Sequence, residues 1–231
     1  MYWVSIAIII VIAFLVWASA DIGSGVYLKT LCRRETDEPF VALTFDDGPD
    51  AVMTPRVLDT LNRYGVKATF FLVGEKVRKH PDIVRRIVGD GHIIGNHTYT
   101  HSAKFPLSSS QSVQKELADT QQIVEDIVGV KMRLFRPPFG VTNPIIGDVV
   151  RYFGMQSIGW SVRSFDTIEK RTREDVCRRI KRKLHNGAVI LLHDRCKNAD
   201  ILLEYLLEEI SACNMQVVML DKLLEIEKYE N

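Results

Sequence analysis

The sequence predicts an α/β protein, a distorted (β/α)7 TIM-like barrel preceded by an N-terminal hydrophobic transmembrane helix. Three observations lead to this fold class. Seven short apolar runs between residues 40 and 220 have the length and composition of buried strands. Helical segments with capping signals separate these runs, an alternation typical of a parallel sheet covered by helices. The first 20 residues carry no charged side chain. Seven strands are one fewer than in a regular barrel of this type.

The first 20 residues form a separate segment. Residues 6–17 are continuously apolar, and about 20 apolar residues span a bilayer as a helix. A cleaved signal peptide is the alternative, because Ala18-Ser19-Ala20 resembles a cleavage site. The length of the apolar run and the absence of Lys or Arg before it favour an uncleaved anchor. We therefore expect a membrane anchor over 1–20, a linker over 21–39 and a catalytic domain over 40–231.

The orientation of the anchor is less clearly indicated. Lys29, Arg33 and Arg34 follow the apolar run, and the positive-inside rule would place them in the cytoplasm. Long domains translocate despite such charges. We expect the catalytic domain on the extracytoplasmic side of the membrane.

Capping residues and glycines delimit the remaining elements. Thr54-Pro55 and Asn143-Pro144 each place an N-cap residue before a proline at the first helical position, and Gly65 ends the first of these helices. The predicted strands are 40–45, 68–73, 92–95, 132–135, 155–160, 188–192 and 216–220. The predicted helices are 54–65, 81–88, 110–128, 143–154, 172–184, 199–212 and a charged segment at the end of the chain.

Composition narrows the class of protein. The chain has 231 residues, 30 Lys and Arg, and 29 Asp and Glu, for a net charge of +1. This balance argues against a dedicated nucleic-acid-binding protein. The four cysteines lack the spacing of a zinc finger, and we expect free thiols, although an oxidising compartment could pair some of them. The basic stretch 171–183 is typical of the solvated face of an outer helix, although it could also meet anionic lipid or polymer.

Two short motifs carry the chemistry. Asp46 and Asp47 end the first apolar run, and His97 and His101 lie four residues apart after the third. One Asp and two His leave a coordination position open, as in a catalytic zinc site. The second Asp is then free to act as a general base on water. The two motifs together predict a metal-dependent hydrolase. Zn²⁺ suits these ligands best, and Co²⁺, Ni²⁺ or Fe²⁺ would also fit.

Further polar residues follow other predicted strands. Arg136 comes after the fourth strand and His193 after the sixth. Barrel enzymes build their active sites at the C-terminal ends of their strands, so we expect these side chains to converge with the two motifs.

The motifs resemble those of the polysaccharide deacetylases with a NodB-homology domain, carbohydrate esterase family 4. The similarity extends from about residue 41 to residue 224. Its four motifs here are 44–49, 97–101, 136–140 and 191–193. The resemblance implies a hydrolase that removes N-acetyl groups from N-acetylhexosamine residues of a cell-envelope polysaccharide, peptidoglycan or chitooligosaccharide.

The resemblance also implies a role for each site residue. Asp47, His97 and His101 would bind the metal, and Asp46 would be the general base. Arg136 would orient Asp46, and His193 would protonate the departing amine. The backbone N–H of Phe139 would stabilise the oxyanion, and Leu191 and Trp160 would line a pocket for the acetyl methyl group.

One motif departs from the family pattern. Arg163 and Thr167 occupy what we take to be the positions of an Asp and a Trp. That Asp is associated with tuning the catalytic His. Asp166 or Arg163 itself could support His193 in its place. Alternatively, Arg163 contacts an anionic substrate and His193 acts without such support.

Two other functions are compatible with the motifs. A hydrolase of a small non-carbohydrate amide would keep the fold and the metal, but small metabolites seldom require a membrane tether. A glycan-binding module with weak or lapsed activity would explain Arg163, but the complete set of catalytic residues favours turnover.

Overall fold

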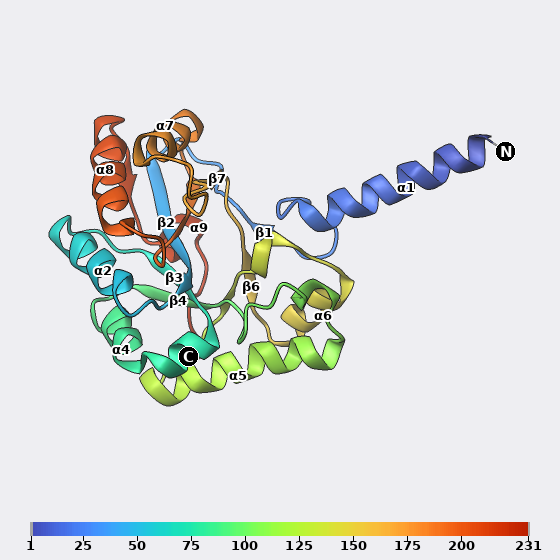
Figure 1. The fold of residues 1–231 in the computed structure, drawn as a ribbon, viewed down its shortest axis with the longest axis horizontal. Coiled ribbons are helices and arrows are strands. Elements are labelled where there is room, and N and C mark those ends of the chain that lie inside the picture. Colours follow the sequence, from blue (N-terminus) through green and yellow to red (C-terminus); the bar gives the residue numbers. More distant parts are fainter. Residues whose placement is uncertain (1, 231) are drawn as a thin grey trace.

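The strands form one curled sheet with helices packed around it (Figure 1). The computed structural model describes residues 2–230. Within them the strand order is β1-β6-β5-β4-β3-β2-β8-β7, with β9 beside β2, and every pairing between these strands is parallel. The predicted fold class is therefore confirmed. The strands are β1 Thr30–Leu31, β2 Phe40–Gly48, β3 Thr69–Leu72, β4 Ile93–Asn96, β5 Leu134–Phe135, β6 Gln156–Ile158, β7 Val162–Arg163, β8 Ala188–His193 and β9 Gln216–Val217.

Two of the predicted helix starts are confirmed and one is wrong. The helix Met53–Arg63 begins before Thr54 and Pro55, which therefore lie in its first turn; its N-cap Val52 has no side-chain cap, and Asp50 Oδ1 accepts from the N–H groups of Val52 and Met53 instead. Asn143 accepts a hydrogen bond from the N–H of Ile146, and Thr172 forms a reciprocal capping box with Asp175. The α-helices are α1 Tyr2–Ala20, α2 Met53–Arg63, α3 Gly74–Lys79, α4 Pro81–Gly89, α5 Ser110–Val128, α6 Pro144–Tyr152, α7 Arg173–Lys183, α8 Ala199–Ala212 and α9 Leu220–Leu224. Two short 3₁₀ helices, η1 Phe105–Leu107 and η2 Pro138–Gly140, lie in loops.

The differences from the predicted elements are confined to short segments. The strands β1 and β7 have two residues each, too few to show a periodic pattern, and α3 is only six residues long. The predicted strand 216–220 is shorter than expected, because α9 begins at Leu220. The segment 21–39 contains β1, which pairs with β6, and its Ile22 and Leu28 are buried. Part of this expected linker therefore packs against the domain.

Apolar side chains fill both faces of the sheet, as expected for parallel strands covered by helices. Along β8, Ile190 and Leu192 face the helices, whereas Val189 faces the concave interior. The interior cluster includes Ala42, Phe71, Ile93, Leu134, Ile158 and Val189. This core holds the strand ends rigidly, and the polar site lies above it.

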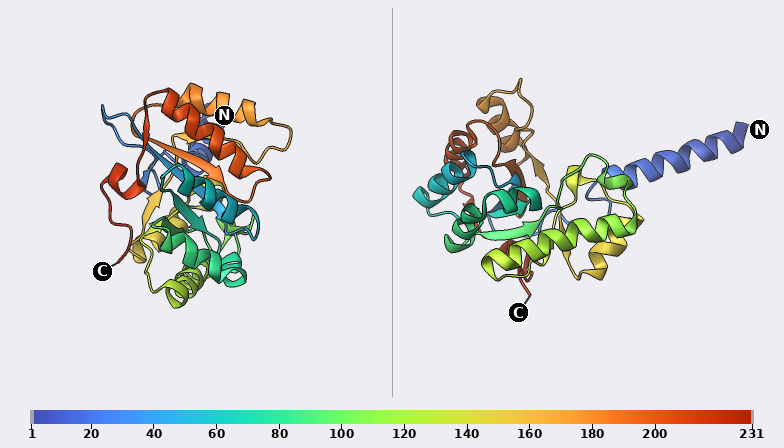
Figure 2. Two further views of the ribbon diagram at one scale, coloured as in Figure 1. Left: turned by 90° about the vertical axis from the view of Figure 1, so that its left-hand side faces the viewer. Right: turned by 60° about the horizontal axis from the view of Figure 1, so that its bottom comes forward.

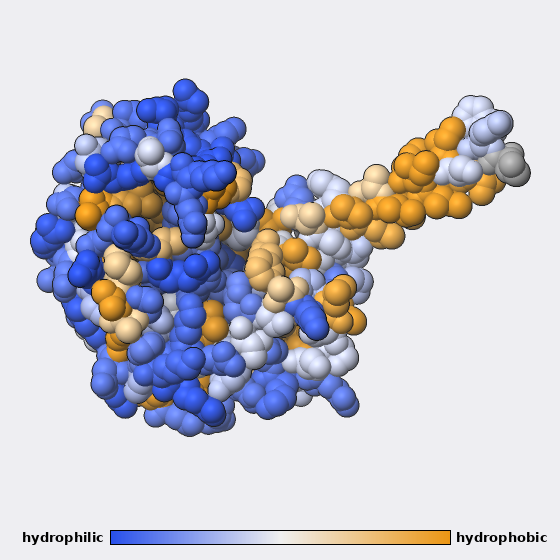
Figure 3. Space-filling model, in the orientation of Figure 1, coloured by the Kyte–Doolittle hydropathy of each residue, from blue (hydrophilic) through white to orange (hydrophobic). Residues whose placement is uncertain are grey.

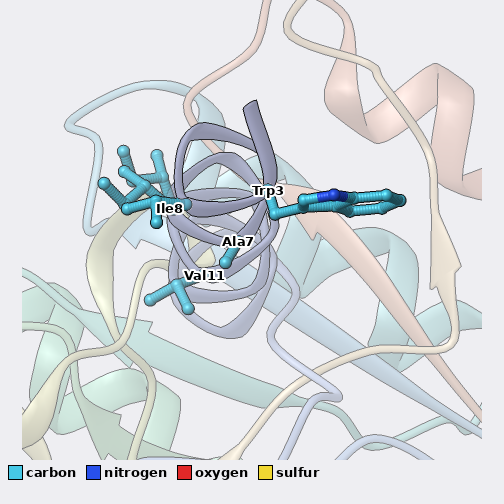
Figure 4. Close-up of a pocket in the computed structure, with 6 residues that line it drawn as sticks. Trp3, Ala7, Ile8 and Val11 are labelled. Atoms are coloured by element: carbon cyan, nitrogen blue, oxygen red, sulfur yellow. The ribbon is translucent and has the colours of Figure 1, made fainter. Parts of the chain in front are cut away.

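Helix α1 projects from the domain (Figures 1 and 2) and has an apolar surface (Figure 3). Its length and composition fit a membrane span or a signal sequence. A shallow depression on its side is lined by apolar residues that include Trp3, Ala7, Ile8 and Val11 (Figure 4). The depression offers no group for catalysis, so the chemistry lies elsewhere.

The C-terminal turn of α1 is part of the folded domain. Ala18 is fully buried, and the carbonyl oxygen of Ser19 accepts a hydrogen bond of 3.0 Å from the N–H of Thr142. Ile22 lies against Gly140 and Gly159. The junction between helix and domain therefore contacts the loop that carries Phe139.

Candidate active site

The predicted site residues converge at the C-terminal ends of the central strands. Asp46 on β2 lies in register with His193 on β8. His97 directly follows β4, and Arg136 directly follows β5. The N–H of Arg136 donates to the carbonyl oxygen of Asn96, which ties the ends of β4 and β5 together. The sheet therefore brings residues from four strands to one edge.

Asp47, His97 and His101 form a compact cluster of potential metal ligands. Asp47 Oδ1 lies 3.5 Å from His97 Nε2 and 3.2 Å from His101 Nε2. The three donor atoms lie within 4.8 Å of one another. Ligands bound at about 2.0–2.1 Å to a tetrahedral zinc ion would be roughly 3.3–3.4 Å apart. The three donor atoms therefore lie close enough together to share one divalent metal ion.

The hydrogen bonds of His97 leave its metal-facing nitrogen free. His97 Nδ1 lies 2.7 Å from the carbonyl oxygen of Arg136. Because a carbonyl oxygen only accepts, Nδ1 carries the proton and Nε2 presents its lone pair. Burial, followed by the charge of His97, lowers the pKa of His101 to about 4. The His101 ring is thus neutral near pH 7, the state that binds a metal.

Two cations hold Asp47 in place. Arg195 Nε donates to Asp47 Oδ2 at 2.7 Å, and Lys76 Nζ donates to the Asp47 carbonyl oxygen at 2.6 Å. Burial alone would raise the pKa of Asp47, but His97, His101 and Arg195 outweigh burial and hold that pKa well below its usual range. Asp47 is therefore ionised and oriented toward the histidines.

Several site residues have strained backbones. Positive φ angles occur at Asp47 (71°), Thr98 (66°), His101 (51°), Phe139 (60°) and Phe165 (59°). Residues other than glycine rarely adopt this conformation, and such strain concentrates at functional sites.

Asp46 lies beside the cluster and is held by a buried arginine. Arg136 Nη1 donates to Asp46 Oδ1 at 2.7 Å, and Asp46 Oδ2 lies 3.8 Å from His97 Nε2. Both side chains are almost completely buried. One carboxylate oxygen is thus occupied by the arginine and the other faces the metal cluster.

The Arg136 guanidinium is fixed in a polar and aromatic cage. Burial lowers the pKa of Arg136, and the charge of Asp46 opposes this effect; a guanidinium stays protonated in proteins. The guanidinium carbon of Arg136 lies 4.1 Å from the centroid of the Phe71 ring. Its remaining hydrogen bonds go to Thr44 Oγ1 and to the carbonyl oxygens of Ile158 and Gly159. These contacts fix the orientation of Asp46.

His193 is supported by Asp166. Asp166 Oδ1 lies 2.8 Å from His193 Nδ1, and Asp166 Oδ2 accepts a hydrogen bond of 2.7 Å from the His193 N–H. Burial alone would lower the pKa of His193, but the hydrogen bond and charge of Asp166, helped by Asp46 and Asp47, raise it above its ordinary value. The neighbouring Ser164 hydroxyl also donates to Asp166 Oδ1.

The side chain of Arg163 lies on aromatic rings. Its guanidinium carbon is 5.6 Å from the centroid of Trp160 and 4.8 Å from that of Phe165. Of Asp166 and Arg163, the two possible supports for His193, Asp166 is the one that contacts His193.

The proposed pocket residues border the same site. Leu191 is buried on β8, two residues before His193. Trp160 is half-buried, and its ring lies so close to Gly140 that no side chain would fit there. Phe139 is 49% exposed, with its ring centroid 4.8 Å from that of His101. Phe139 therefore lies against one ring of the metal cluster, and Trp160 lies near Arg136, whose guanidinium carbon is 5.7 Å from its ring centroid.

Sequence reasoning missed Arg195, Lys76 and Asp194. Arg195 lies two residues after His193, a position at a strand end that could have drawn attention. Lys76 lies in α3, and no local pattern connects it with Asp47. Asp194 is fully buried against Gly48, accepts a hydrogen bond of 2.5 Å from Thr54 Oγ1, and has a pKa that burial raises to about 7.

The fold is a curled parallel barrel with an Asp-His-His cluster at its strand ends. A separate carboxylate and a separate imidazole lie beside this cluster. This is the architecture of a metal-dependent hydrolase. The polysaccharide deacetylase family model matches residues 33–158. The chain belongs to the polysaccharide deacetylase family.

Individual relatives agree with this assignment. A peptidoglycan-N-acetylglucosamine deacetylase of Listeria monocytogenes is 35% identical over 87% of this chain and 42% of its own length. The match thus spans well under half of that relative. A chitooligosaccharide deacetylase of Sinorhizobium fredii is 32% identical over 74% of this chain and 79% of its own length. The crystal structure of the Bc1960 peptidoglycan N-acetylglucosamine deacetylase has a TM-score of 0.82 and 28% identity, covering 87% of this chain and 95% of that one.

Proposed function

We propose that the protein is a metal-dependent deacetylase that hydrolyses the acetamido group of N-acetylhexosamine residues in a cell-envelope glycan. The observation that carries the proposal is the arrangement of Asp46 and His193 beside the Asp47-His97-His101 cluster. A carboxylate held by Arg136 and an imidazole held by Asp166 provide a base and an acid next to one metal position. Relatives named as peptidoglycan and chitooligosaccharide deacetylases support the substrate class.

Asp47, His97 and His101 would hold the metal ion. Zn²⁺ is the preferred ion for two imidazoles and a carboxylate, and Co²⁺, Ni²⁺ or Fe²⁺ also suit these donors. When bound, the ion would supply Lewis acidity that activates water and polarises the acetyl carbonyl.

Asp46 acts as the general base. Its Oδ2 removes a proton from the attacking water as the new C–O bond forms at the acetyl carbon. Because Arg136 occupies Oδ1, the free oxygen keeps one orientation through this step. The backbone N–H of Phe139 would donate to the developing oxyanion.

His193 acts as the general acid. An amide nitrogen cannot leave as an anion, so His193 donates a proton to it while the C–N bond breaks. The products are acetate and the free amine of the sugar. The raised pKa of His193 favours the protonated form that this step requires. Leu191 and Trp160 line the space for the acetyl methyl group.

We further propose that α1 is an uncleaved membrane anchor and that the domain acts on the extracytoplasmic side, where envelope glycan is found. The junction supports anchoring without cleavage. Ala18 is buried and the Ser19 carbonyl is hydrogen-bonded to Thr142, so cleavage after Ala20 would remove residues that pack in the domain.

Acetate release tests the proposed function. The full-length protein in detergent is incubated with chitooligosaccharides, peptidoglycan, acetylated exopolysaccharide and simple N-acetylated amides, with and without each metal. We expect metal-dependent acetate release from glycans. Turnover confined to the simple amides would identify a non-carbohydrate amidase, and glycan binding without any turnover would identify a lapsed enzyme.

A further inference from the structure

Three arginines surround the ring of Phe165 beside the proposed active site. The guanidinium carbons of Arg179, Arg163 and Arg171 lie 4.3, 4.8 and 5.0 Å from the ring centroid of Phe165. The phenyl ring therefore makes cation–π contacts with three guanidinium groups. Its own backbone has a positive φ of 59°, an unfavourable conformation for phenylalanine.

The charges of these arginines are not balanced by ion pairs. Among residues 2–230, none of the three forms a salt bridge with an acidic side chain. The nearby acidic groups have other partners: Asp166 binds His193, Glu174 pairs with Arg173, and Asp175 pairs with Arg178. Glu169 is exposed on the same loop and, among the described residues, forms no salt bridge. Three close like charges repel one another, and an anion bound between them would offset this repulsion.

The three arginines around Phe165 lie on the same face of the sheet as the active site. Leu191 is in register with Thr44 on β2 and with Arg163 on β7. Side chains at paired positions of parallel strands point to the same face, and Thr44 contacts Arg136 within the site. Arg163 and Arg136 also approach one ring, with guanidinium carbons 5.6 and 5.7 Å from the centroid of Trp160.

A hollow continues from the cluster along the surface. It has a volume of about 640 Å³ and lies between the N-terminal ends of α7 and α8. Arg171 and Asp166 line it together with Arg195, which contacts the proposed metal ligand Asp47. The hollow is large enough to hold a sugar residue. Of the three arginines Arg171 lines it, so the hollow joins Arg171 to Arg195 beside the catalytic centre. Its other charged lining residues include Glu169, Glu174, Arg173 and Lys197.

We propose that Arg163 and Arg171 form an anion subsite that binds an acidic substituent of the glycan next to the sugar being deacetylated. The inference rests on the proposed function and specifies its substrate as an anionic glycan. A guanidinium binds both carboxylates and phosphates in a planar, paired geometry. The substituent is thus a carboxylate on the sugar or its peptide, or a phosphodiester attached to the glycan. Arg179, whose Nε donates to the Arg163 carbonyl oxygen at 3.0 Å, positions β7 against α7.

Matched substrates test the subsite. The metal-loaded wild-type protein is assayed with an oligosaccharide of alternating N-acetylglucosamine and N-acetylmuramic acid, with its methyl ester, and with neutral chitotetraose. To test a phosphodiester as the substituent, turnover of wall glycan is compared before and after removal of its phosphodiester polymers. We expect the preferred anionic substrate to exceed its neutralised counterpart in kcat/KM by about tenfold, as expected for one charge-assisted contact at a partly exposed site.

Single substitutions locate the effect. Arg163→Gln and Arg171→Gln should each reduce this preference severalfold, mainly through a higher KM. Arg163→Lys should retain part of it, because the charge remains. Lys222→Gln on α9, which removes one positive charge at the opposite end of the barrel, is the control and should leave the preference unchanged.

The outcomes separate the subsite from the catalytic proposal. Turnover with equal kcat/KM for charged and neutralised substrates, or an unchanged preference in both Gln variants, would refute the subsite. Absence of turnover on every glycan would refute the proposed function. In that case calorimetric titration with the same acid and ester still tests the subsite: tighter binding of the acid that is lost in Arg163→Gln supports it, and equal binding overturns it.

Discussion

Asp166 Oδ1 lies 2.8 Å from His193 Nδ1, and the other oxygen of the same carboxylate accepts a hydrogen bond from the His193 N–H. The carboxylate thus fixes both the ring and the backbone of the proposed acid. A hydrogen bond at Nδ1 leaves Nε2 as the nitrogen available for proton transfer to substrate.

The pH dependence of catalysis should reveal this pair. Asp166 raises the pKa of His193, so Asp166→Asn should lower it. The acid must be protonated, so activity falls as pH rises through this pKa, and the basic limb of the pH–rate profile should move to lower pH. Glu38→Gln, which removes an exposed carboxylate just before the start of β2, is the control. An unmoved basic limb in Asp166→Asn would exclude His193 as the group that titrates there.

The junction between α1 and the domain should matter for activity as well as for anchoring. Ile22 is 7% exposed and lies against Gly140 and Gly159. Burial of such a side chain contributes about 1.5–3 kcal/mol, so Ile22→Ala should lower the melting temperature by several degrees and reduce kcat/KM. Val26→Ala, at a position 43% exposed, should do neither.

Truncation tests the same contact differently. A chain beginning at Ala18 retains the Ser19–Thr142 hydrogen bond and Ile22, whereas one beginning at Ser24 loses both. We expect the longer form to be soluble and active and the shorter form to be less stable, as measured by thermal unfolding. Equal stability and activity of the two forms would show that the junction has no role beyond tethering.

Asp194 should make stability depend on pH. Its pKa is raised to about 7 by burial, so the folded state binds its proton more tightly than the unfolded state. The contribution of protonated Asp194 to the free energy of unfolding is therefore complete below about pH 4 and is lost as the pH rises through about 7. Asp194→Asn should flatten this dependence in urea unfolding with a chelator present, and Asp37→Asn, an exposed control, should not. A steeper profile in Asp194→Asn would reverse the proposed sign.

Metal content identifies the ligands. Asp47→Ala, His97→Ala and His101→Ala should each lose the bound metal while circular dichroism remains that of a folded barrel, because the side chains lie at loops beyond the strand ends. His185→Ala, which removes an imidazole outside the cluster, should keep its metal. Wild-type metal content in any of the three variants removes that residue from the proposed site.

Long elements with caps could be predicted from the sequence, and short or tertiary features could not. The helix at 110–128 was predicted at its observed bounds, because its apolar positions recur with helical spacing over many turns. Strands β1 and β7 have two residues each and owe their conformation to their neighbours β6 and β8. No local pattern encodes such a strand.

The same distinction applies to the site. Asp46, Asp47, His97 and His101 lie in compact motifs, so sequence alone brought them together as one site. The contacts of Arg195 and Lys76 with Asp47 depend on how β8 and α3 pack around β2. Asp166 and Arg163 were left as alternatives, because spacing does not determine which of two side chains near β7 turns toward His193.

The most direct test of the proposed chemistry is the rate of acetate release by Asp46→Asn at a measured metal content. We expect full metal occupancy and a rate reduced by roughly two to four orders of magnitude, because the substitution removes the base but none of the three proposed ligands. A rate near that of the wild type, with metal bound, would contradict the assignment of Asp46 as the general base.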